Sequence, residues 1–454
     1  MNDLAISIES VLTKGDGAER TARVQGLRRL SGGASRETWS FAAMERNLIL
    51  RRDPPYQQNA DAMQLEAAAF AAADDAGVPV PKVLTSGDGS DSIGTPYLIM
   101  EHVDGEAIPR RLLRDPEYAD ARRALAPELG SVLAKIHSIP AASVPGLRVA
   151  DPLRDTQSSH DVYGEGRPAL EIAFRWLAEN QPETNRRTVV HGDFRNGNLM
   201  VGTTPRDGHY VRAVLDWELV HSGDPMEDLG WLCAKAWRFG SNLPVGGFGT
   251  RDELLDGYAN VAGFRPDPKT LLWWEVLATI KWAVICRKQV EKYHNGSDRS
   301  VEKAVLGRRI AESEYDALLA IGVMDAAPLD DVLHTPRPTI GLLTGGEAPN
   351  ADELLNAVGQ FLVNQDTVGA DRFYARVAAN AVQIARREGL IGSDIRDSHN
   401  RRLSKLGFDS DVALSTAIRN GELHHRWSDT VDSICESVRD KLRISNPGYV
   451  TEPR

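Results

Sequence analysis

The chain contains 454 residues, of which 42% are hydrophobic and 26% are charged. This composition is typical of a folded protein rather than a disordered one, and the length predicts two or three domains. The formal net charge of -11 at pH 7 disfavours a dedicated nucleic-acid-binding protein, which usually presents a basic face.

The first hundred residues predict a small lobe of mixed strand and helix. Residues 47–52 are typical of a strand that ends at 53–55, because the prolines there cannot donate to a β ladder. The alanine-rich segment 60–75 has a helical pattern, which ends at the Gly-Val-Pro-Val-Pro run of residues 77–81. Residues 96–103 predict a further strand.

From about residue 115 onward, helical periodicity dominates the sequence. Helices are predicted at 118–139, 168–180, 225–238, 252–262, 271–293 and 300–321, and hairpins at 189–216 interrupt them. We therefore expect an α+β fold with two lobes. The small β-containing N-lobe would comprise residues 1–104, and the mostly helical C-lobe residues 105–334.

The composition changes after the C-lobe. Residues 335–351 are rich in turn-forming residues and predict a linker. Beyond it, helical patterning at 352–363, 369–388, 410–419 and 427–442 predicts a small all-α accessory domain at 352–454. This last segment contains no evident group of catalytic side chains.

The segment His191-Gly-Asp-Phe-Arg-Asn-Gly-Asn198 carries the strongest functional signal. It lies between apolar runs at 188–190 and 199–201, and a second apolar run ends at Asp216. Phosphoryl transfer needs this inventory: one Asp orients and deprotonates the attacking hydroxyl, while an Asn and a second Asp hold magnesium. The alternative is a plain hairpin loop in which Asp and Asn serve as turn residues.

On these residues the chain resembles the aminoglycoside phosphotransferase and choline kinase superfamily, over about residues 20–325. The marks are the segments 191–199, 214–219 and 223–231. Residues 50–55 and 77–81 resemble the branch fused to, or working beside, acyl-CoA dehydrogenases, which includes kinases of 4-hydroxyacyl-CoA thioesters. The tail from about residue 349, with 373–381 and 386–388, resembles a small helical protein that accompanies such kinases. The resemblance implies a protein-kinase-like two-lobe fold.

The resemblance also implies roles for particular residues. Asp193 matches the catalytic base, and Asn198 and Asp216 match the ligands of the Mg²⁺ that accompanies ATP. Glu66 matches the glutamate that braces a phosphate-binding cation, although a solvated helix charge is the alternative. The usual strand lysine is replaced by Arg51, which preserves the charge but changes the geometry of phosphate binding.

Further residues are expected to bind the nucleotide or to support the loop. The phosphate-covering loop would consist of Ser31, Gly32, Gly33, Ala34 and Ser35. The connector whose backbone contacts adenine would be Met100, Glu101, His102 and Val103, for which an ordinary edge strand is the alternative. Structural support of the loop is expected from His191, Arg195, Asp224 and Asp228. Asp224 precedes Pro225 and is a good helix N-cap.

The resemblance implies that the acceptor substrate is a small molecule with a hydroxyl group. Lys281 and Arg287, on the helix predicted at 271–293, are candidates for binding a phosphate-bearing CoA thioester. We expect a hydroxyacyl-CoA or a related hydroxy acid from catabolism. The alternatives are an aminoglycoside-type antibiotic kinase and a nucleotide-binding pseudoenzyme whose tail recruits a partner. A homodimer is also compatible with the tail.

The location expected from the sequence is the cytoplasm, where ATP is available. The three cysteines follow no metal-ligand spacing and are expected to be reduced thiols. The first residues show no signal-peptide pattern. The helix candidate at 271–286 contains Glu275 and Lys281, so we expect no membrane partner.

Overall fold

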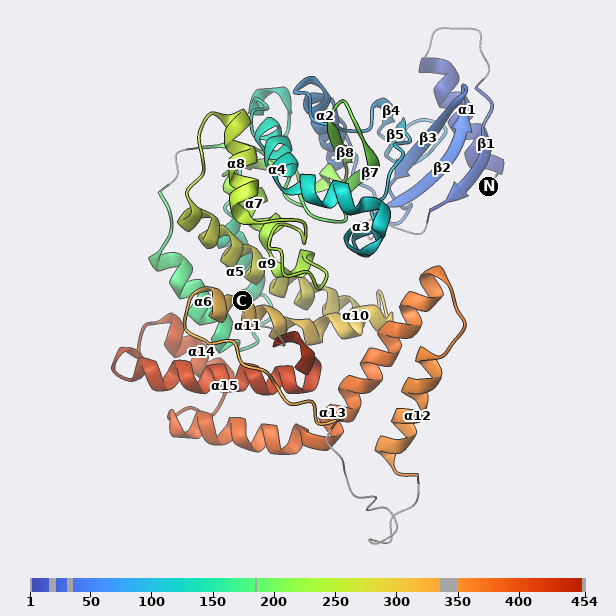
Figure 1. The fold of residues 1–454 in the computed structure, drawn as a ribbon. Helices are drawn as coiled ribbons and strands as arrows, with labels where there is room; N and C mark the ends of the chain where they lie inside the picture. Colours follow the sequence, from blue (N-terminus) through green and yellow to red (C-terminus); the bar gives the residue numbers. More distant parts are fainter. Residues whose placement is uncertain (1, 16–21, 31–35, 184–185, 335–348, 451–454) are drawn as a thin grey trace. The chain divides into compact units, whose positions relative to one another are not determined.

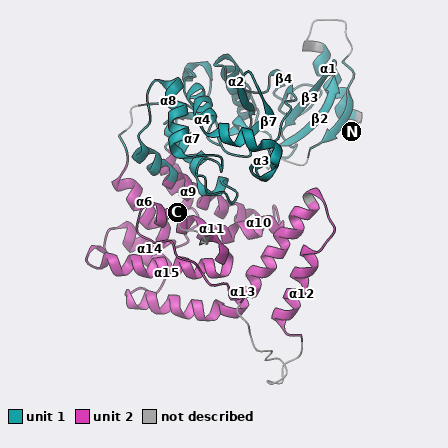
Figure 2. Ribbon diagram, viewed as in Figure 1, with its two compact units in different colours: residues 1–151, 182–275 teal, residues 152–181, 276–454 magenta. Residues whose placement is uncertain are grey.

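The structure is a computed structural model that describes residues 2–15, 22–30, 36–183, 186–334 and 349–450. Contacts group the chain into two compact units, one formed by residues 1–151 and 182–275 and the other by residues 152–181 and 276–454 (Figure 2). The domain limits expected from the sequence stay a prediction. None of the helices in the described ranges has both the length and the apolar character needed to cross a membrane.

The first unit begins with helix α1 (Asn2–Gly15) and a five-stranded antiparallel sheet of order β1-β2-β3-β5-β4 (Figure 1). The strands are β1 (Gln25–Arg29), β2 (Glu37–Ala43), β3 (Arg46–Arg52), β4 (Val83–Gly87) and β5 (Tyr97–Glu101). Leu48 and Leu50 of β3 are fully buried in one core with Ile8 of α1. Because side chains alternate along a strand, Ile49 and Arg51 point to the opposite face.

Helix α2 (Ala60–Asp75) connects β3 to β4 and has the limits that the sequence predicts. Asn59 caps its first turn, since its side chain accepts a hydrogen bond from the backbone N–H of Ala62. Glu66 and Phe70 lie on the buried side of α2. The helix therefore places a carboxylate in the interior, next to the strand that carries Arg51.

The rest of the first unit is helical, with two short ladders. The helices are α3 (Pro109–Arg114), α4 (Ala119–Ile136), α7 (Met226–Cys233) and α8 (Arg251–Ala262). Strand β6 (Thr188–Val190) pairs with β9 (His221–Gly223), and β7 (Leu199–Arg206) pairs with β8 (His209–Val214). The helix predicted at 225–238 is shorter than expected, because it ends at Cys233 and a 3-10 turn follows.

The second unit is entirely helical in its described part. Its helices are α5 (Pro152–Asp161), α6 (Pro168–Glu179), α10 (Val301–Leu306), α11 (Ile310–Ala320), α12 (Ala351–Val363), α13 (Gly369–Lys405), α14 (Asp411–Arg419) and α15 (Trp427–Ser445). Helix α9 (Pro268–His294) begins in the first unit and continues into the second. Helix α13 runs to Lys405 rather than ending near 388, and a 3-10 turn divides the helix predicted at 300–321.

One hydrophobic core joins the C-terminal helices to helices from the middle of the chain. It contains Ile172 of α6 and Leu318 of α11, together with Leu403, Ile418 and Leu442 from α13, α14 and α15. Burial of large aliphatic side chains contributes roughly 1.5–3 kcal/mol each relative to exposure. The last hundred residues therefore depend on α6 and α11 for much of their packing.

Candidate active site

The loop 191–198 connects β6 to β7 and is fixed by its first two residues. Gly192 has φ +83°, and a Cβ atom there would lie 2.5 Å from the carbonyl oxygen of Leu219, so glycine is required. The buried His191 contacts the Leu215 carbonyl through Nε2 at 3.0 Å and accepts from the Asp193 N–H through Nδ1 at 3.2 Å. Burial lowers the pKa of His191, so the ring is neutral.

Asp228, on α7, also holds the 191–198 loop in place. Its carboxylate accepts hydrogen bonds from the backbone N–H groups of His191 at 2.8 Å and Gly192 at 2.9 Å. His137 of α4 contacts it at 3.1 Å. Burial opposes ionisation, but the hydrogen bonds from His137 and the loop hold the pKa of Asp228 below its usual value. Asp224 lies two residues before α7 and accepts from the Met226 N–H at 2.8 Å, but the N-cap position expected for it belongs to Pro225.

Three donors surround the carboxylate of Asp193. Trp231 Nε1 donates to Oδ1 at 2.7 Å, Arg195 Nε donates to Oδ1 at 3.0 Å, and Asn198 Nδ2 donates to Oδ2 at 2.7 Å. Trp231 comes from α7, and the guanidinium of Arg195 lies 4.5 Å from the ring centroid of Trp237. The carboxylate is thus held in one orientation, while 15% of the side chain stays exposed.

Asn198 directly precedes β7, and Asp216 lies two residues beyond the end of β8, the strand that pairs with β7. The Leu215 N–H donates to the Asn198 carbonyl oxygen at 2.9 Å, which ties Asn198 to the residue before Asp216. Asn198 uses its amide nitrogen for Asp193, and no described residue donates to its Oδ1. Asp216 has φ +66°, a left-handed conformation that is costly for a residue with a side chain and that clusters at functional sites.

Arg51 links Asp216 to helix α2. It donates to Glu66 Oε1 and to Asp216 Oδ1, both at 2.7 Å. Burial opposes ionisation of Asp216, but the Arg51 guanidinium outweighs it and holds the pKa of Asp216 below its usual value. Glu66 is fully buried and pairs also with Arg36, which contacts Asp53 at 3.2 Å. Two arginines therefore neutralise one buried glutamate.

The remaining candidate residues for nucleotide binding are placed as follows. Ser31, Gly32, Gly33, Ala34 and Ser35 lie outside the described residues. Met100 is buried in β5 opposite Ile49. The N–H groups of Glu101 and His102 donate to the carbonyls of Lys82 and Asn47, each at 2.9 Å. The N–H of Val103 donates to no backbone carbonyl among the described residues outside the helices and strands.

The two residues proposed for substrate binding belong to the second unit. Both lie on α9, and Lys281 is half-buried. Arg287 donates to Glu165 at 2.6 Å and to Glu291 at 3.2 Å, and it lies over the ring of Tyr163. Arg287 is therefore already paired with two carboxylates.

The oxygen donors at the end of the β7–β8 ladder suit a hard divalent cation. Mg²⁺ binds oxygen ligands and usually takes only one or two from the protein, with water and phosphate oxygens at the other positions. Asn198 Oδ1 and the Asp216 carboxylate provide such a pair. In the described ranges there is no cluster of three or more His, Cys, Asp or Glu side chains that could form an all-protein cage.

Comparison with known proteins agrees with this geometry. Residues 26–269, more than half of the chain, match the phosphotransferase enzyme family. The chain belongs to this family. The family match includes the 191–198 loop, Asp216, Arg51 and Glu66. Residues 365–449 match a second family, a domain of unknown function (DUF6285).

Relatives of this phosphotransferase are much longer proteins. Acyl-CoA dehydrogenase family member 10 from Mus musculus is 33% identical over 227 residues, which are 47% of this chain and 20% of that protein. Acyl-CoA dehydrogenase family member 11 from Homo sapiens is 28% identical over 320 residues, or 65% of this chain and 40% of that protein. The chain thus spans less than half the length of these relatives.

A solved structure confirms the fold expected from the sequence. A Ralstonia eutropha protein of the aminoglycoside phosphotransferase type superposes with a TM-score of 0.56 and 21% identity, covering 69% of this chain and 97% of that chain. The resemblance to the aminoglycoside phosphotransferase superfamily, and to its branch associated with acyl-CoA dehydrogenases, is confirmed as well.

Sequence reasoning missed two residues of the site. Trp231 donates to Asp193, and Arg36 shares Glu66 with Arg51. Trp231 lies within the 223–231 segment that carries the family resemblance, so its position offered a signal. Arg36 directly follows the small-residue loop and offered none, because a single arginine before a strand is common on protein surfaces.

Proposed function

We propose that the protein transfers a phosphoryl group from ATP, with Mg²⁺, to a hydroxyl group of a small molecule. The main support for the proposal is that Asp193, Asn198 and Asp216 lie close together in a member of the phosphotransferase family. The first two belong to the 191–198 loop, and Asp216 follows β8. In addition, the guanidinium of Arg51 on β3 is held by its ion pair with Glu66 on α2 and can serve as a cation for phosphate.

Asp193 is the residue proposed to accept the proton of the attacking hydroxyl. A carboxylate is a weak base, but a fixed one within hydrogen-bond reach can set the line of attack and take the proton late. The bonds from Trp231, Arg195 and Asn198 supply that fixed orientation. They also place the carboxylate without the need for a prior rearrangement.

Asn198 and Asp216 are the residues proposed to hold the metal, and Arg51 the residue proposed to contact phosphate. When bound, Mg-ATP supplies the transferable phosphoryl group, and the cation neutralises charge that develops on its oxygens. In the structure Arg51 already engages Asp216 at 2.7 Å. Metal binding therefore competes with an ion pair, and the arginine is available for phosphate once that pair opens.

The acceptor we propose is a hydroxyacyl-CoA or a related hydroxy acid formed in catabolism in the cytoplasm. The relatives named above carry the matching region in one polypeptide with acyl-CoA dehydrogenase family sequence. Regions joined in one chain commonly act on connected metabolites. A kinase acting on a hydroxylated acyl-CoA would fit beside a dehydrogenase that acts on acyl-CoA.

The test is ATP consumption by the purified protein with Mg²⁺ across 3-, 4- and 5-hydroxyacyl-CoAs, their free acids and several aminoglycosides. Mass spectrometry identifies any phosphorylated product, and an Asp193→Asn variant prepared in parallel excludes contaminating kinases. One phosphorylated acyl-CoA supports the proposal and names the substrate. A phosphorylated aminoglycoside overturns the substrate class, and ATP binding without product from any acceptor favours a pseudoenzyme.

A further inference from the structure

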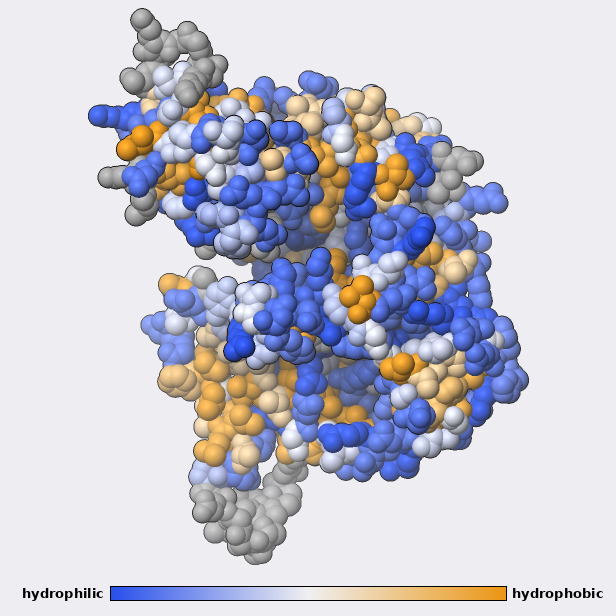
Figure 3. Space-filling view, turned by 180° about the vertical axis from the view of Figure 1, so that it is seen from behind, coloured by the Kyte–Doolittle hydropathy of each residue, from blue (hydrophilic) through white to orange (hydrophobic). Residues whose placement is uncertain are grey.

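A row of charged residues runs through the first unit and ends at the candidate active site. Hydrophilic residues cover much of the face of the molecule that Figure 3 shows, and charged side chains usually lie at such a surface. The side chains of this row are instead largely withdrawn from solvent. Its members, in order of contact, are Asp53, Arg36, Glu66, Arg51 and Asp216. The first four are at most 14% exposed and Asp216 is 30% exposed, so their charges depend on one another for compensation.

Arg36 is held at two points of its guanidinium. Its Nε contacts Asp53 Oδ1 at 3.2 Å, and its Nη1 contacts Glu66 Oε2. Asp53 in turn accepts from the backbone N–H of Asn59 through Oδ2 at 2.7 Å. Asn59 is the N-cap of α2, the helix that carries Glu66. The position of Arg36 is therefore fixed relative to the carboxylate of Glu66.

The two oxygens of Glu66 are divided between two arginines. Arg51 Nη1 donates to Oε1 at 2.7 Å, whereas Arg51 Nη2 donates to Asp216 Oδ1 at 2.7 Å. The other oxygen, Oε2, is taken by Arg36. A guanidinium pairs most strongly with a carboxylate when it donates to both oxygens in a planar fork. Arg51 does not form such a fork with Glu66, because Arg36 occupies the second oxygen.

The charge of Arg36 acts in the same direction as its position. Burial and the positive charge of Arg51 lower the pKa of Arg36, while Asp53 acts in the opposite sense. An arginine stays charged in spite of such shifts. The two guanidinium groups therefore repel each other beside one carboxylate, which weakens the hold of Glu66 on Arg51.

We propose that Arg36 is a positioning residue, which keeps Arg51 Nη2 available at the active site by occupying the second oxygen of Glu66. In the structure this nitrogen contacts Asp216, and with a metal ion on Asp216 it turns to a phosphate of the nucleotide. Without Arg36, the fork between Arg51 and Glu66 forms and Nη2 leaves both partners. The inference rests on the proposed function, because it concerns the phosphate contact of Arg51.

Simple neutralisation of Glu66 is the alternative role for Arg36. Loss of a purely structural ion pair would loosen β2 and β3 against α2, and it would weaken the binding of metal and nucleotide alike. The positioning role predicts two effects of opposite sign. Asp216, released from Arg51, binds the metal ion more readily, whereas the nucleotide loses one contact to its phosphates.

The first test is calorimetric titration of ADP into the wild type and Arg36→Met at several Mg²⁺ concentrations, with no acceptor present. We expect the Mg²⁺ concentration for half-maximal ADP binding to fall. At saturating Mg²⁺, where the Arg51–Asp216 pair is already open, the Kd for ADP should rise by roughly tenfold, the equivalent of one charge-assisted hydrogen bond. Arg52→Met is the matched control and should change neither value, since Arg52 is 17% exposed and contacts Glu37 at 2.8 Å.

A charge-balanced variant guards against loss of the fold. Arg36→Met combined with Asp53→Asn removes one charge of each sign, and an asparagine at position 53 can still accept from the Asn59 N–H. It should show the same two effects. A wild type that binds no ADP contradicts the proposed function and the inference with it. If the wild type binds ADP, then unchanged binding in these variants, or weaker binding of both Mg²⁺ and ADP, overturns the inference alone.

The second test combines Arg36→Met with Arg51→Lys. A lysine ammonium is a compact charge that can contact a carboxylate and a phosphate together, but it has no planar fork for Glu66 to capture. In the Arg51→Lys background, Arg36→Met should therefore change the Kd for ADP little. A rise as large as the one in the wild-type background would show that Arg36 acts without Arg51 and would overturn the inference.

Discussion

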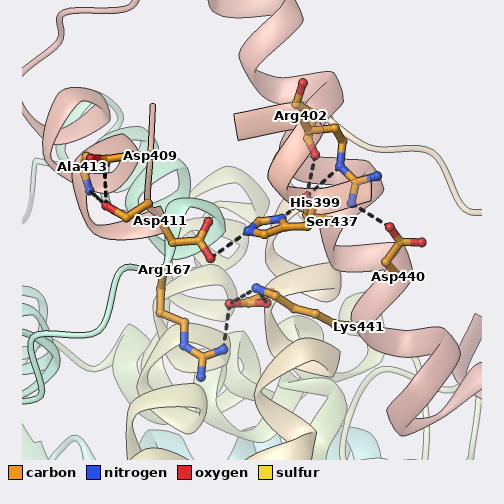
Figure 4. Close-up of polar contacts among 12 residues, drawn as sticks. Arg167, His399, Arg402, Asp409, Asp411, Ala413, Ser437, Asp440 and Lys441 are labelled. Carbon is orange, nitrogen blue, oxygen red and sulfur yellow. Dashed lines mark hydrogen bonds and ion pairs between the residues drawn. The ribbon is translucent and has the colours of Figure 1, made fainter. Parts of the chain in front are cut away.

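The chain contains two polar clusters with similar residues and different organisation. In the first unit, His191, Asp193, Asn198 and Asp216 surround the end of a ladder. In the second unit, Figure 4 shows His399 between Asp411 and Ser437, at 3.2 Å from Asp411 Oδ2 and 3.1 Å from Ser437 Oγ. By residue types alone, the second cluster would suggest a Ser-His-Asp triad as readily as the first suggests a kinase.

The hydrogen bonds of the second cluster are satisfied internally. The Ser437 hydroxyl donates to the Ser433 carbonyl of its own helix at 2.9 Å and accepts from Arg402 Nε at 3.1 Å. Its proton is thus directed to the helix rather than to His399. Arg402 in turn pairs with Asp440 at 2.6 Å. Such a network fixes the packing of α13 on α15 and leaves no activated nucleophile.

Glu314, a buried carboxylate near this cluster, is also paired within the protein. Glu314 is fully buried and contacts both Arg167 at 3.2 Å and Lys441 at 3.1 Å. Burial opposes its ionisation, but the two cations outweigh burial and lower the pKa of Glu314. The first cluster differs because no described residue donates to Asn198 Oδ1 and because Asp216 has a left-handed backbone. Unused acceptors and backbone strain, more than residue types, distinguish a candidate site.

Asp193→Asn should have the largest effect, on turnover, and tests the contrast between the two polar clusters most directly. Loss of a general base lowers turnover by roughly 10²–10⁴-fold, while nucleotide affinity should change little because the side-chain shape is kept. Steady-state kinetics with the identified acceptor, together with calorimetric titration of ADP, measure the two effects. Unchanged turnover would remove Asp193 from the role of base.

Asp228→Asn should mainly lower stability. An amide cannot accept from both loop N–H groups and from His137 at once, so we expect a loss of roughly 3 kcal/mol at neutral pH. The folded pKa of Asp228 is below its usual value, so its contribution is present above about pH 4, the unfolded value, and is lost as pH falls through the folded pKa.

The measurement is denaturant unfolding of the Asp228→Asn variant and the wild type at several pH values. The difference between them should shrink as pH falls below about 4. Asp252→Asn is the control, since Asp252 is 79% exposed in its ion pair and should cost well under about 1 kcal/mol. A difference for residue 228 that does not depend on pH would contradict the assigned pKa shift.

Arg51→Lys should have an intermediate effect on metal dependence. A lysine cannot span Glu66 and Asp216 with a planar fork, so Asp216 would lose a charge-assisted hydrogen bond. We expect the Mg²⁺ concentration for half-maximal activity to fall by roughly tenfold, the equivalent of one such bond. Arg52→Lys is the control, because Arg52 contacts Glu37 at 2.8 Å on the other face of β3. An equal shift in both variants would contradict the proposed competition.

The sequence predicted the local features well, because they depend on short segments. The Asp193 to Asn198 spacing, the strand that carries Arg51 and the limits of α2 are all set by neighbouring residues. The contact of Trp231 with Asp193 joins residues from a loop and a helix, and no periodicity marks it. Likewise, the core shared by α6 with α13 to α15 joins segments more than two hundred residues apart. Such contacts are decided by tertiary packing.

Ser437→Ala should have the smallest effect and tests the second polar cluster. The variant removes the hydroxyl between His399 and Arg402, whose side chains are 23% and 22% exposed, so water can replace the lost bonds. We expect a stability loss of about 1 kcal/mol and turnover within about twofold of the wild type. Unfolding curves and acceptor kinetics on the same preparation measure both. If turnover fell as far as in Asp193→Asn, the second cluster would take part in the reaction. A cluster whose hydrogen bonds are all made within the protein could then no longer be classed as purely structural on that ground.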